Sequence, residues 1–127
     1  QDYRERADQT LKAFAAKISR LPSAMPMMLS AFSDSLTPPR QIVIAGDPAR
    51  PDTRAMLREV NQRYLPNTVI LLADGGKHQI ELANCLPFLA AMKPLNGKAT
   101  AYVCRNYACQ APTNDLEKLR KILDEVR

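Results

Sequence analysis

The sequence predicts an α/β fold, in which a small three-stranded, mainly parallel sheet with the order β-α-β-α-β-α follows a two-helix N-terminal arm. Three short, nearly continuous apolar runs alternate with segments of helical periodicity, which is typical of buried parallel strands. The first forty residues, in contrast, show an apolar stripe of helical spacing. We therefore expect a helical arm over residues 1–39 and an α/β domain over residues 40–127.

Two helices are predicted in the arm. The first ends at Pro22, because a proline ring nitrogen has no N–H to donate to a helix. The second is expected to begin near Met25 and to end before Pro38. Its methionines, at helical spacing, are more typical of packing than of an adaptable binding surface. Apolar residues recur at spacings of three and four along the first helix, at Tyr3, Ala7, Leu11, Phe14, Ile18 and Leu21.

Strands and helices alternate in the predicted α/β domain. The strands are β-branched or apolar runs closed by turn residues. One helix is expected to have Asp52 as its N-cap, and the last helix follows a capping-box spacing at Asn114 and Glu117. The strands are expected at 41–45, 68–73 and 99–104, and the helices between Asp52 and Pro66, over 82–92 and from Leu116 onward.

Three loops would meet at one edge of such a parallel sheet, where ligands usually bind: Gly46-Asp47-Pro48, Asp74-Gly75-Gly76 and Cys104 to Pro112. The first, Gly46-Asp47-Pro48, lacks the glycine motifs of phosphate-binding loops, so a tight turn is the favoured interpretation. The lone histidine, His78, lies in a polar segment and is expected to be solvated. A sugar- or nucleotide-binding crevice is the weakest functional hypothesis. Its candidate ligand-binding residues are Asp47, Asp74, Gly75 and Arg105.

Cys104 and Cys109 are the candidate redox residues. Their spacing is neither the C-x-x-C of dithiol oxidoreductases nor that of a zinc knuckle, and we predict no metal site and no cofactor. A disulfide requires that a turn bring their Cα atoms within about 7 Å of each other. Two reduced, buried cysteines are the favoured state. If the pair is redox-active, Arg105 would favour the thiolate form.

Composition narrows the partners and the compartment. The net charge is +5, but the basic residues are scattered and few aromatic residues accompany them, which disfavours a nucleic-acid partner. No apolar run reaches the length of a membrane span, and the charged N-terminus is unlike a signal peptide. Three cysteines cannot all pair with one another, so we expect a cytoplasmic protein. The sequence lacks an initiator methionine, which suggests a fragment of a longer chain.

The segment from Gly97 to Pro112, with its Cys-Arg-Asn-x-x-Cys-Gln core, resembles the C-terminal region of the thioredoxin-domain-containing, spermatogenesis-associated protein twenty-like family. The segments Ile42–Pro48 and Cys85–Leu89 resemble the same region. The resemblance implies a parent protein with a thioredoxin-like domain, then an (α/α)-barrel, then this chain. Residues 1–39 would then be the last helices of the barrel, and residues 40–127 an α/β appendage on it.

The resemblance implies a context more than a reaction. The first functional hypothesis is a non-catalytic accessory or interaction domain of a larger protein whose activity is not established. Its partners would be the thioredoxin-like domain and the barrel of the parent chain. The alternative is a redox element that uses Cys104 and Cys109 in thiol-disulfide exchange.

Overall fold

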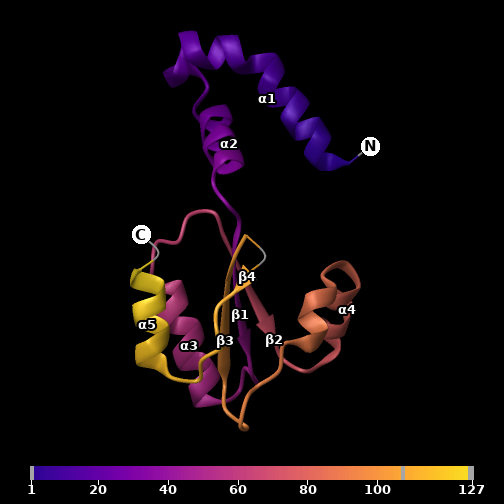
Figure 1. Ribbon diagram of the computed structural model, residues 1–127, viewed down its shortest axis with the longest axis vertical. Coiled ribbons are helices and arrows are strands. Elements are labelled where there is room, and N and C mark those ends of the chain that lie inside the picture. Colours follow the sequence, from indigo (N-terminus) through magenta and orange to yellow (C-terminus); the bar gives the residue numbers. More distant parts are fainter. Residues whose placement is uncertain (1, 107, 126–127) are drawn as a thin grey trace. The chain divides into compact units, whose positions relative to one another are not determined.

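The computed structural model describes residues 2–106 and 108–125 and divides the chain into two compact units, Gln1–Pro38 and Pro39–Arg127 (Figure 1). We call them the helical unit and the α/β unit. Across the described residues, no helix combines the length and the apolar character that a membrane span requires.

The helical unit contains the two predicted helices. Helix α1 (Tyr3–Arg20) begins after Asp2, whose side chain accepts a hydrogen bond from the Arg4 N–H as an N-cap. Helix α2 (Pro26–Leu36) follows a short 3₁₀ helix, η1 (Pro22–Ala24). Of the described residues in this unit, only Ile18 is buried.

The α/β unit begins with the strand-helix-strand order that the sequence predicts. Strand β1 (Arg40–Ala45) leads through one helix, α3 (Pro51–Asn61), to strand β2 (Thr68–Ala73). One helix between two strands returns the chain to the edge where the first strand began, so β1 and β2 pair in parallel.

The prediction of a three-stranded, mainly parallel sheet is wrong. Strand β3 (Thr100–Arg105) runs antiparallel to β1, and a fourth strand, β4 (Ala108–Cys109), runs antiparallel to β3. The sheet is therefore mixed, with four strands in the order β2-β1-β3-β4. The overall α/β class holds.

The direction of β3 follows from the helical segments before it. Helix α4 (Lys77–Cys85) and the 3₁₀ helix η2 (Pro87–Ala91) pack against each other. Helix α4 leads the chain away from the carboxyl edge of β2, and η2 leads it back. Strand β3 therefore starts beside the end of β1. The helix predicted over 82–92 thus begins earlier, and it breaks before Pro87, which cannot donate a backbone hydrogen bond.

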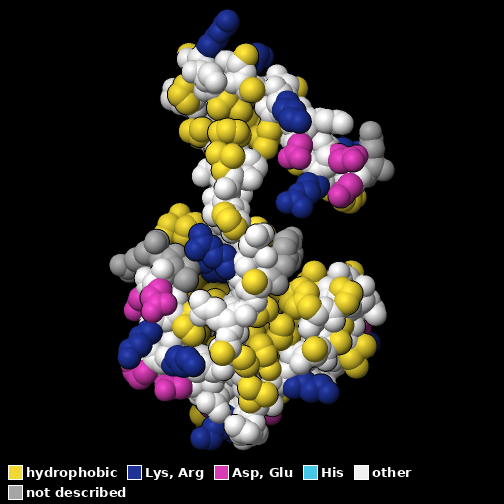
Figure 2. Space-filling view, in the orientation of Figure 1, with side chains coloured by type: hydrophobic (Ala, Val, Ile, Leu, Met, Phe, Trp, Pro, Cys, Tyr) yellow, Lys and Arg dark blue, Asp and Glu magenta, His cyan; other side chains and the backbone are white. Residues whose placement is uncertain are grey.

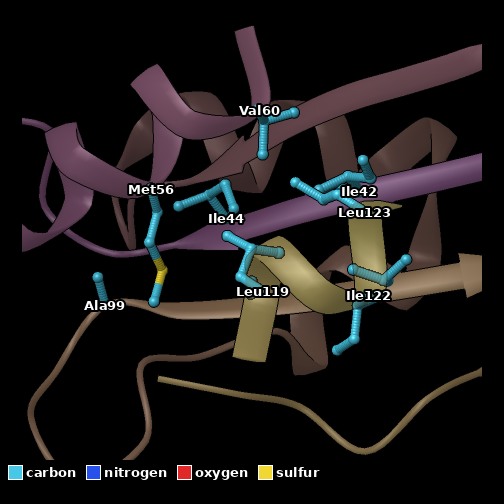
Figure 3. Packing of buried hydrophobic residues seen from close by; sticks show 10 residues of the cluster. Ile42, Ile44, Met56, Val60, Ala99, Leu119, Ile122 and Leu123 are labelled. Atoms are coloured by element: carbon cyan, nitrogen blue, oxygen red, sulfur yellow. The ribbon is translucent and has the colours of Figure 1, made fainter. Parts of the chain in front are cut away.

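Each face of the sheet has its own apolar core. Successive residues of β1 point to opposite faces, so Ile42 and Ile44 pack on one side and Val43 and Ala45 on the other. The first face is covered by α3 and by α5 (Leu116–Asp124), as Figure 3 shows. The second face is covered by the segment of α4 and η2, where Leu89 is fully buried.

Two acidic residues organise the helix ends differently from the prediction. Asp52 is not an N-cap, since α3 begins at Pro51. Its carboxylate instead accepts from the Ala99 N–H at 3.0 Å, which ties α3 to the start of β3 and lowers the pKa of Asp52. The N-cap of α5 is Asp115, one residue beyond the predicted Asn114, and it accepts from the Glu117 N–H at 2.8 Å.

Candidate functional site

The Cys104–Cys109 pair forms a disulfide between β3 and β4. The two cysteines are direct partners in the strand register, with their Cα atoms 3.8 Å apart. The adjacent pair is hydrogen-bonded, because the Gln110 N–H donates to the Val103 carbonyl at 2.9 Å. The cysteines therefore occupy a non-hydrogen-bonded position, where the side chains of paired antiparallel strands approach most closely.

A tight turn creates this pairing. Asn106 has a φ of 49°, in the left-handed region that short hairpin turns need and that Asn tolerates. Its N–H donates to the Pro39 carbonyl at 2.9 Å. The expectation of two reduced cysteines is therefore wrong for this structure. An extended strand end would have separated them, but the chain reverses directly after β3.

The two sulfur-bearing residues differ in burial. Cys104 belongs to the central part of the sheet and is 1% exposed, whereas Cys109 lies on the outer strand and is exposed. Cys85, at the end of α4, is an exposed free cysteine. Within the described ranges, no three His, Cys, Asp or Glu side chains lie close enough together to hold a metal ion.

Arg105 follows Cys104 directly but belongs to the other face of the sheet, because side chains alternate along a strand. It pairs in register with Arg40 on β1. Burial, and then the positive charge of Arg105, lower the pKa of Arg40. The two guanidinium groups thus influence each other on the face that α5 covers, and alternation directs Arg105 away from the disulfide.

The structure does not bring the four predicted ligand-binding residues together. Asp47 and Asp74 follow the parallel strands β1 and β2 and lie at the same edge of the sheet. Arg105 lies at the opposite edge, because β3 is antiparallel. The three-loop crevice expected from a parallel sheet is therefore absent from the described structure.

The acidic loops at the carboxyl edge have local structural roles. Asp47 accepts from the Ala49 N–H at 2.8 Å, and Asp74 accepts from the Gly76 N–H at 2.8 Å, which closes both turns. Gly75 has a φ of 75°, which favours glycine. These bonds give one oxygen of each carboxylate a role in closing its own turn.

Gly46 is required by a close approach. A Cβ atom at this position would lie 2.4 Å from Thr53 Oγ1 and 3.3 Å from both Thr53 Cγ2 and Ala99 Cβ. Gly46→Ala is expected to lower the free energy of unfolding by about 1–2 kcal/mol, since overpacking forces neighbours to move. Urea denaturation followed by circular dichroism measures this, and Gly76→Ala, whose nearest contact is 3.4 Å, is the control. Equal stability of both variants would contradict the prediction.

A second feature is an apolar hollow of about 630 Å³, lined by α4, η2 and the following loop. The buried Gln79 holds these segments together. Its Oε1 accepts from the Gly75 N–H at 2.7 Å, and its Nε2 donates to the carbonyls of Leu89 at 2.7 Å and Met92 at 3.1 Å. The sequence does not reveal this residue, because nothing in a polar stretch marks one glutamine as buried. Apolar lining residues include Ile80, Ala83, Pro87, Ala90 and Met92.

Relatives match nearly the whole chain. Spermatogenesis-associated protein 20 of Homo sapiens is 41% identical over 122 residues, which make up 96% of this chain and 15% of the human protein. The Mus musculus protein of the same name is 38% identical over 98% of this chain and 16% of its own length. An uncharacterised protein of Caenorhabditis elegans is 22% identical over 98% of this chain and 17% of its own length. No family model and no solved structure matches.

The match extends over both the helical unit and the α/β unit, because it covers 96–98% of the chain. The chain spans only 15–16% of the length of these mammalian relatives. This agrees with the resemblance found in the cysteine-containing segment and in two further segments. The chain is therefore homologous to one segment of the larger mammalian proteins named spermatogenesis-associated protein 20.

Proposed function

We propose that the chain is a non-catalytic accessory module that packs against other domains of a larger protein. The observation that supports this most directly is the exposure of the helical unit. Helix α2 has no buried residue, and Figure 2 shows hydrophobic side chains gathered over it. Exposed apolar surface of this kind is typical of an interface. The exposed side chains on α2 include Met27, Leu29, Phe32 and Leu36.

The proposed partners are a thioredoxin-like domain and an (α/α)-barrel in the same parent chain. The helical unit would supply the last helices of the barrel, and the α/β unit would be an appendage on it. Support comes from the family resemblance and from the small share of each mammalian relative that the chain spans. A barrel helix buries its apolar stripe against its neighbours, which would cover the exposed stripe of α2.

Hydrogen exchange tests this proposal. We expect the amides of α2 to exchange rapidly in the 127-residue chain and to be protected in a full-length family member that contains the equivalent segment. The amides of α3, whose Met56 and Val60 are buried, serve as the control and should be protected in both proteins. Equal exchange of α2 in the two proteins would contradict the proposal.

A redox role is the second candidate, and the Cys104–Cys109 disulfide favours it. We keep a cytoplasmic location as part of this proposal. Disulfides in the cytosol are rare and are usually transient and catalytic or redox-sensing, so a disulfide there would favour exchange over a purely structural role. The helical and α/β units would still pack as proposed above.

Thiol titration provides the corresponding prediction. Without reductant, the denatured protein should show one free thiol, that of Cys85, and after treatment with a dithiol it should show three. A redox role further requires half-reduction at a potential above about −300 mV in a dithiol buffer, since structural disulfides lie below this value. A lower potential would exclude the redox role and leave the accessory role intact.

A further inference from the structure

We propose that Cys109 is the sulfur that an incoming thiolate attacks, and that Cys104 is the buried leaving group and resolving thiol. The proposal rests on the redox role above and assigns a different function to each cysteine. The co-reactant is a dithiol, such as a protein with a vicinal cysteine pair.

The direction of attack follows from the position of the disulfide in the sheet. Thiol-disulfide exchange requires the thiolate, the attacked sulfur and the leaving sulfur to lie nearly in line. The disulfide joins β3 to β4, and β4 is the outermost strand of the described sheet. An approach to Cys109 therefore comes from outside the sheet edge.

An approach to Cys104 is blocked by the fold. On its other side, Cys104 pairs in register with Gln41, so strand β1 lies next to it where Cys109 has only the sheet edge. Cys104 is 1% exposed, so its side chain offers almost no surface to a reagent. A thiolate could reach this sulfur only if the sheet opened.

Leaving-group chemistry alone would favour attack on Cys104, with Cys109 as the leaving group. A thiolate at the exposed Cys109 is better solvated than one at the buried Cys104, and burial in apolar surroundings raises the pKa of a thiol. Exchange is faster when the leaving thiol has the lower pKa. Access decides against this preference, because a sulfur without an open approach does not react, however good its leaving group.

The exchange consists of two balanced displacements. First, the thiolate of the dithiol forms a bond to Sγ of Cys109, the Cys104–Cys109 bond breaks, and Cys104 takes the electron pair and then a proton from water. Second, the other thiol of the dithiol, as a thiolate, attacks its own partner sulfur and releases Cys109, which is protonated in turn. The dithiol becomes a disulfide, and the two cysteines become thiols.

A monothiol is expected to stop at the first step. Strand pairing keeps Cys104 beside the mixed disulfide on Cys109, so Cys104 can attack back and expel the monothiol. A dithiol escapes this reversal, because its second thiol is equally close to the mixed disulfide. This geometry favours a dithiol as the physiological co-reactant.

Adduct mapping with glutathione tests the assignment. A Cys85→Ser background removes the free thiol, and trypsin cuts after Arg105, which places the two cysteines on separate peptides, 99–105 and 106–118. After brief exposure to excess glutathione, acid quenching and alkylation, mass spectrometry should find at least about tenfold more glutathione on Cys109 than on Cys104. In concentrated urea, which removes the fold, this preference should be lost.

Two outcomes in the folded protein would overturn the assignment: equal adducts on the two cysteines, or more adduct on Cys104. Two further variants, each made in the same Cys85→Ser background, give a second measurement. Cys104→Ser leaves Cys109 free and should react rapidly with an aromatic disulfide reagent, whereas Cys109→Ser leaves Cys104, which should react at least about tenfold more slowly. A reduction potential too low for a redox role would exclude that role but would not change which cysteine carries the glutathione. Failure of the redox role and failure of the assignment are therefore distinguishable.

Discussion

Replacement of Leu119 by alanine is expected to lower the free energy of unfolding of the α/β unit by about 2–5 kcal/mol. Leu119 is fully buried on α5 and belongs to the larger apolar core, together with Ile44 of β1 and Met56 of α3 (Figure 3). Truncation removes apolar contacts and leaves a cavity that three separate elements would have to close. The rigid strands and the helix make such closure incomplete.

Urea denaturation followed by circular dichroism measures this loss. The matched control is Ile80→Ala on α4, because Ile80 is also a large aliphatic residue on a helix but is 66% exposed. Its effect should lie within about 0.5 kcal/mol. A loss for Leu119→Ala no larger than that of the control would mean that α5 does not hold the core as the structure shows.

The sequence identifies strands well, but it does not determine their direction. The apolar runs at 41–45, 68–73 and 99–104 all coincide with strands. The third is antiparallel because two helical segments, α4 and η2, precede it where a single helix was expected. Apolar periodicity gives the element type, whereas direction depends on how many times the chain crosses the sheet between strands. A break before Pro87 was the available signal.

The fourth strand and the disulfide share one cause and were missed together. Strand β4 contains only Ala108 and Cys109, which is too short for any alternating pattern. It exists because the turn at Asn106 returns the chain along β3. An asparagine directly after a strand is a recognised turn signal. The same signal would have favoured the disulfide over two reduced cysteines.

The candidate ligand-binding residues show a different limit. Asp47 and Asp74 were correctly expected beside strand ends at one edge, because β1 and β2 are parallel. Arg105 was expected at this edge only because the third strand was predicted to run parallel to the first two. One wrong strand direction therefore separated the predicted set, although the position of every member along its strand or loop was sound.

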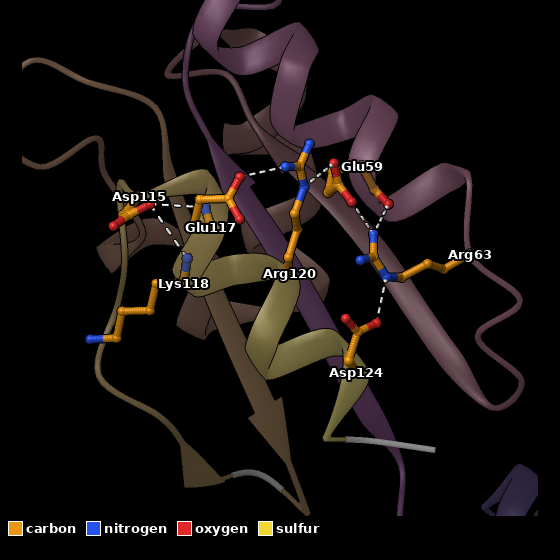
Figure 4. Close-up of polar contacts among 7 residues, drawn as sticks. All are labelled: Glu59, Arg63, Asp115, Glu117, Lys118, Arg120 and Asp124. Atoms are coloured by element: carbon orange, nitrogen blue, oxygen red, sulfur yellow. Dashed lines mark hydrogen bonds and ion pairs between the residues drawn. The ribbon is translucent and has the colours of Figure 1, made fainter.

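Glu59→Gln is expected to destabilise the α/β unit by about 1.5–3 kcal/mol at neutral pH, as is typical when a hydrogen bond to a charged group is lost. Glu59, on α3, lies between two arginines (Figure 4). Its carboxylate pairs with Arg63, two residues beyond the end of α3, and accepts from Arg120 Nε of α5 at 2.9 Å. The Glu59 side chain is only 12% exposed, so water replaces these bonds poorly. This carboxylate thus joins the two helices that cover one face of the sheet.

The pH dependence of stability distinguishes the contribution of the Glu59 charge from the contribution of its side-chain packing. The hydrogen bond from Arg63, followed by that from Arg120, lowers the pKa of Glu59 in the folded protein. A carboxyl group whose pKa is lower in the folded state stabilises the fold fully above its unfolded pKa, about 4.3, and loses this contribution as the pH falls through the folded value. The difference between wild type and Glu59→Gln should therefore shrink as the pH falls below about 5.

Urea titrations at a series of pH values measure this difference. The control is Glu81→Gln on α4, since the Lys77–Glu81 pair is well exposed at 87% and 58%. Exposed pairs contribute about 0–1 kcal/mol, so this variant should track the wild type across the whole range. A pH-independent loss for Glu59→Gln would assign its effect to packing. Arg63 keeps Asp124 and Arg120 keeps Glu117 as partners in the variant, so any pH-dependent loss reports the central carboxylate and not two stranded cations.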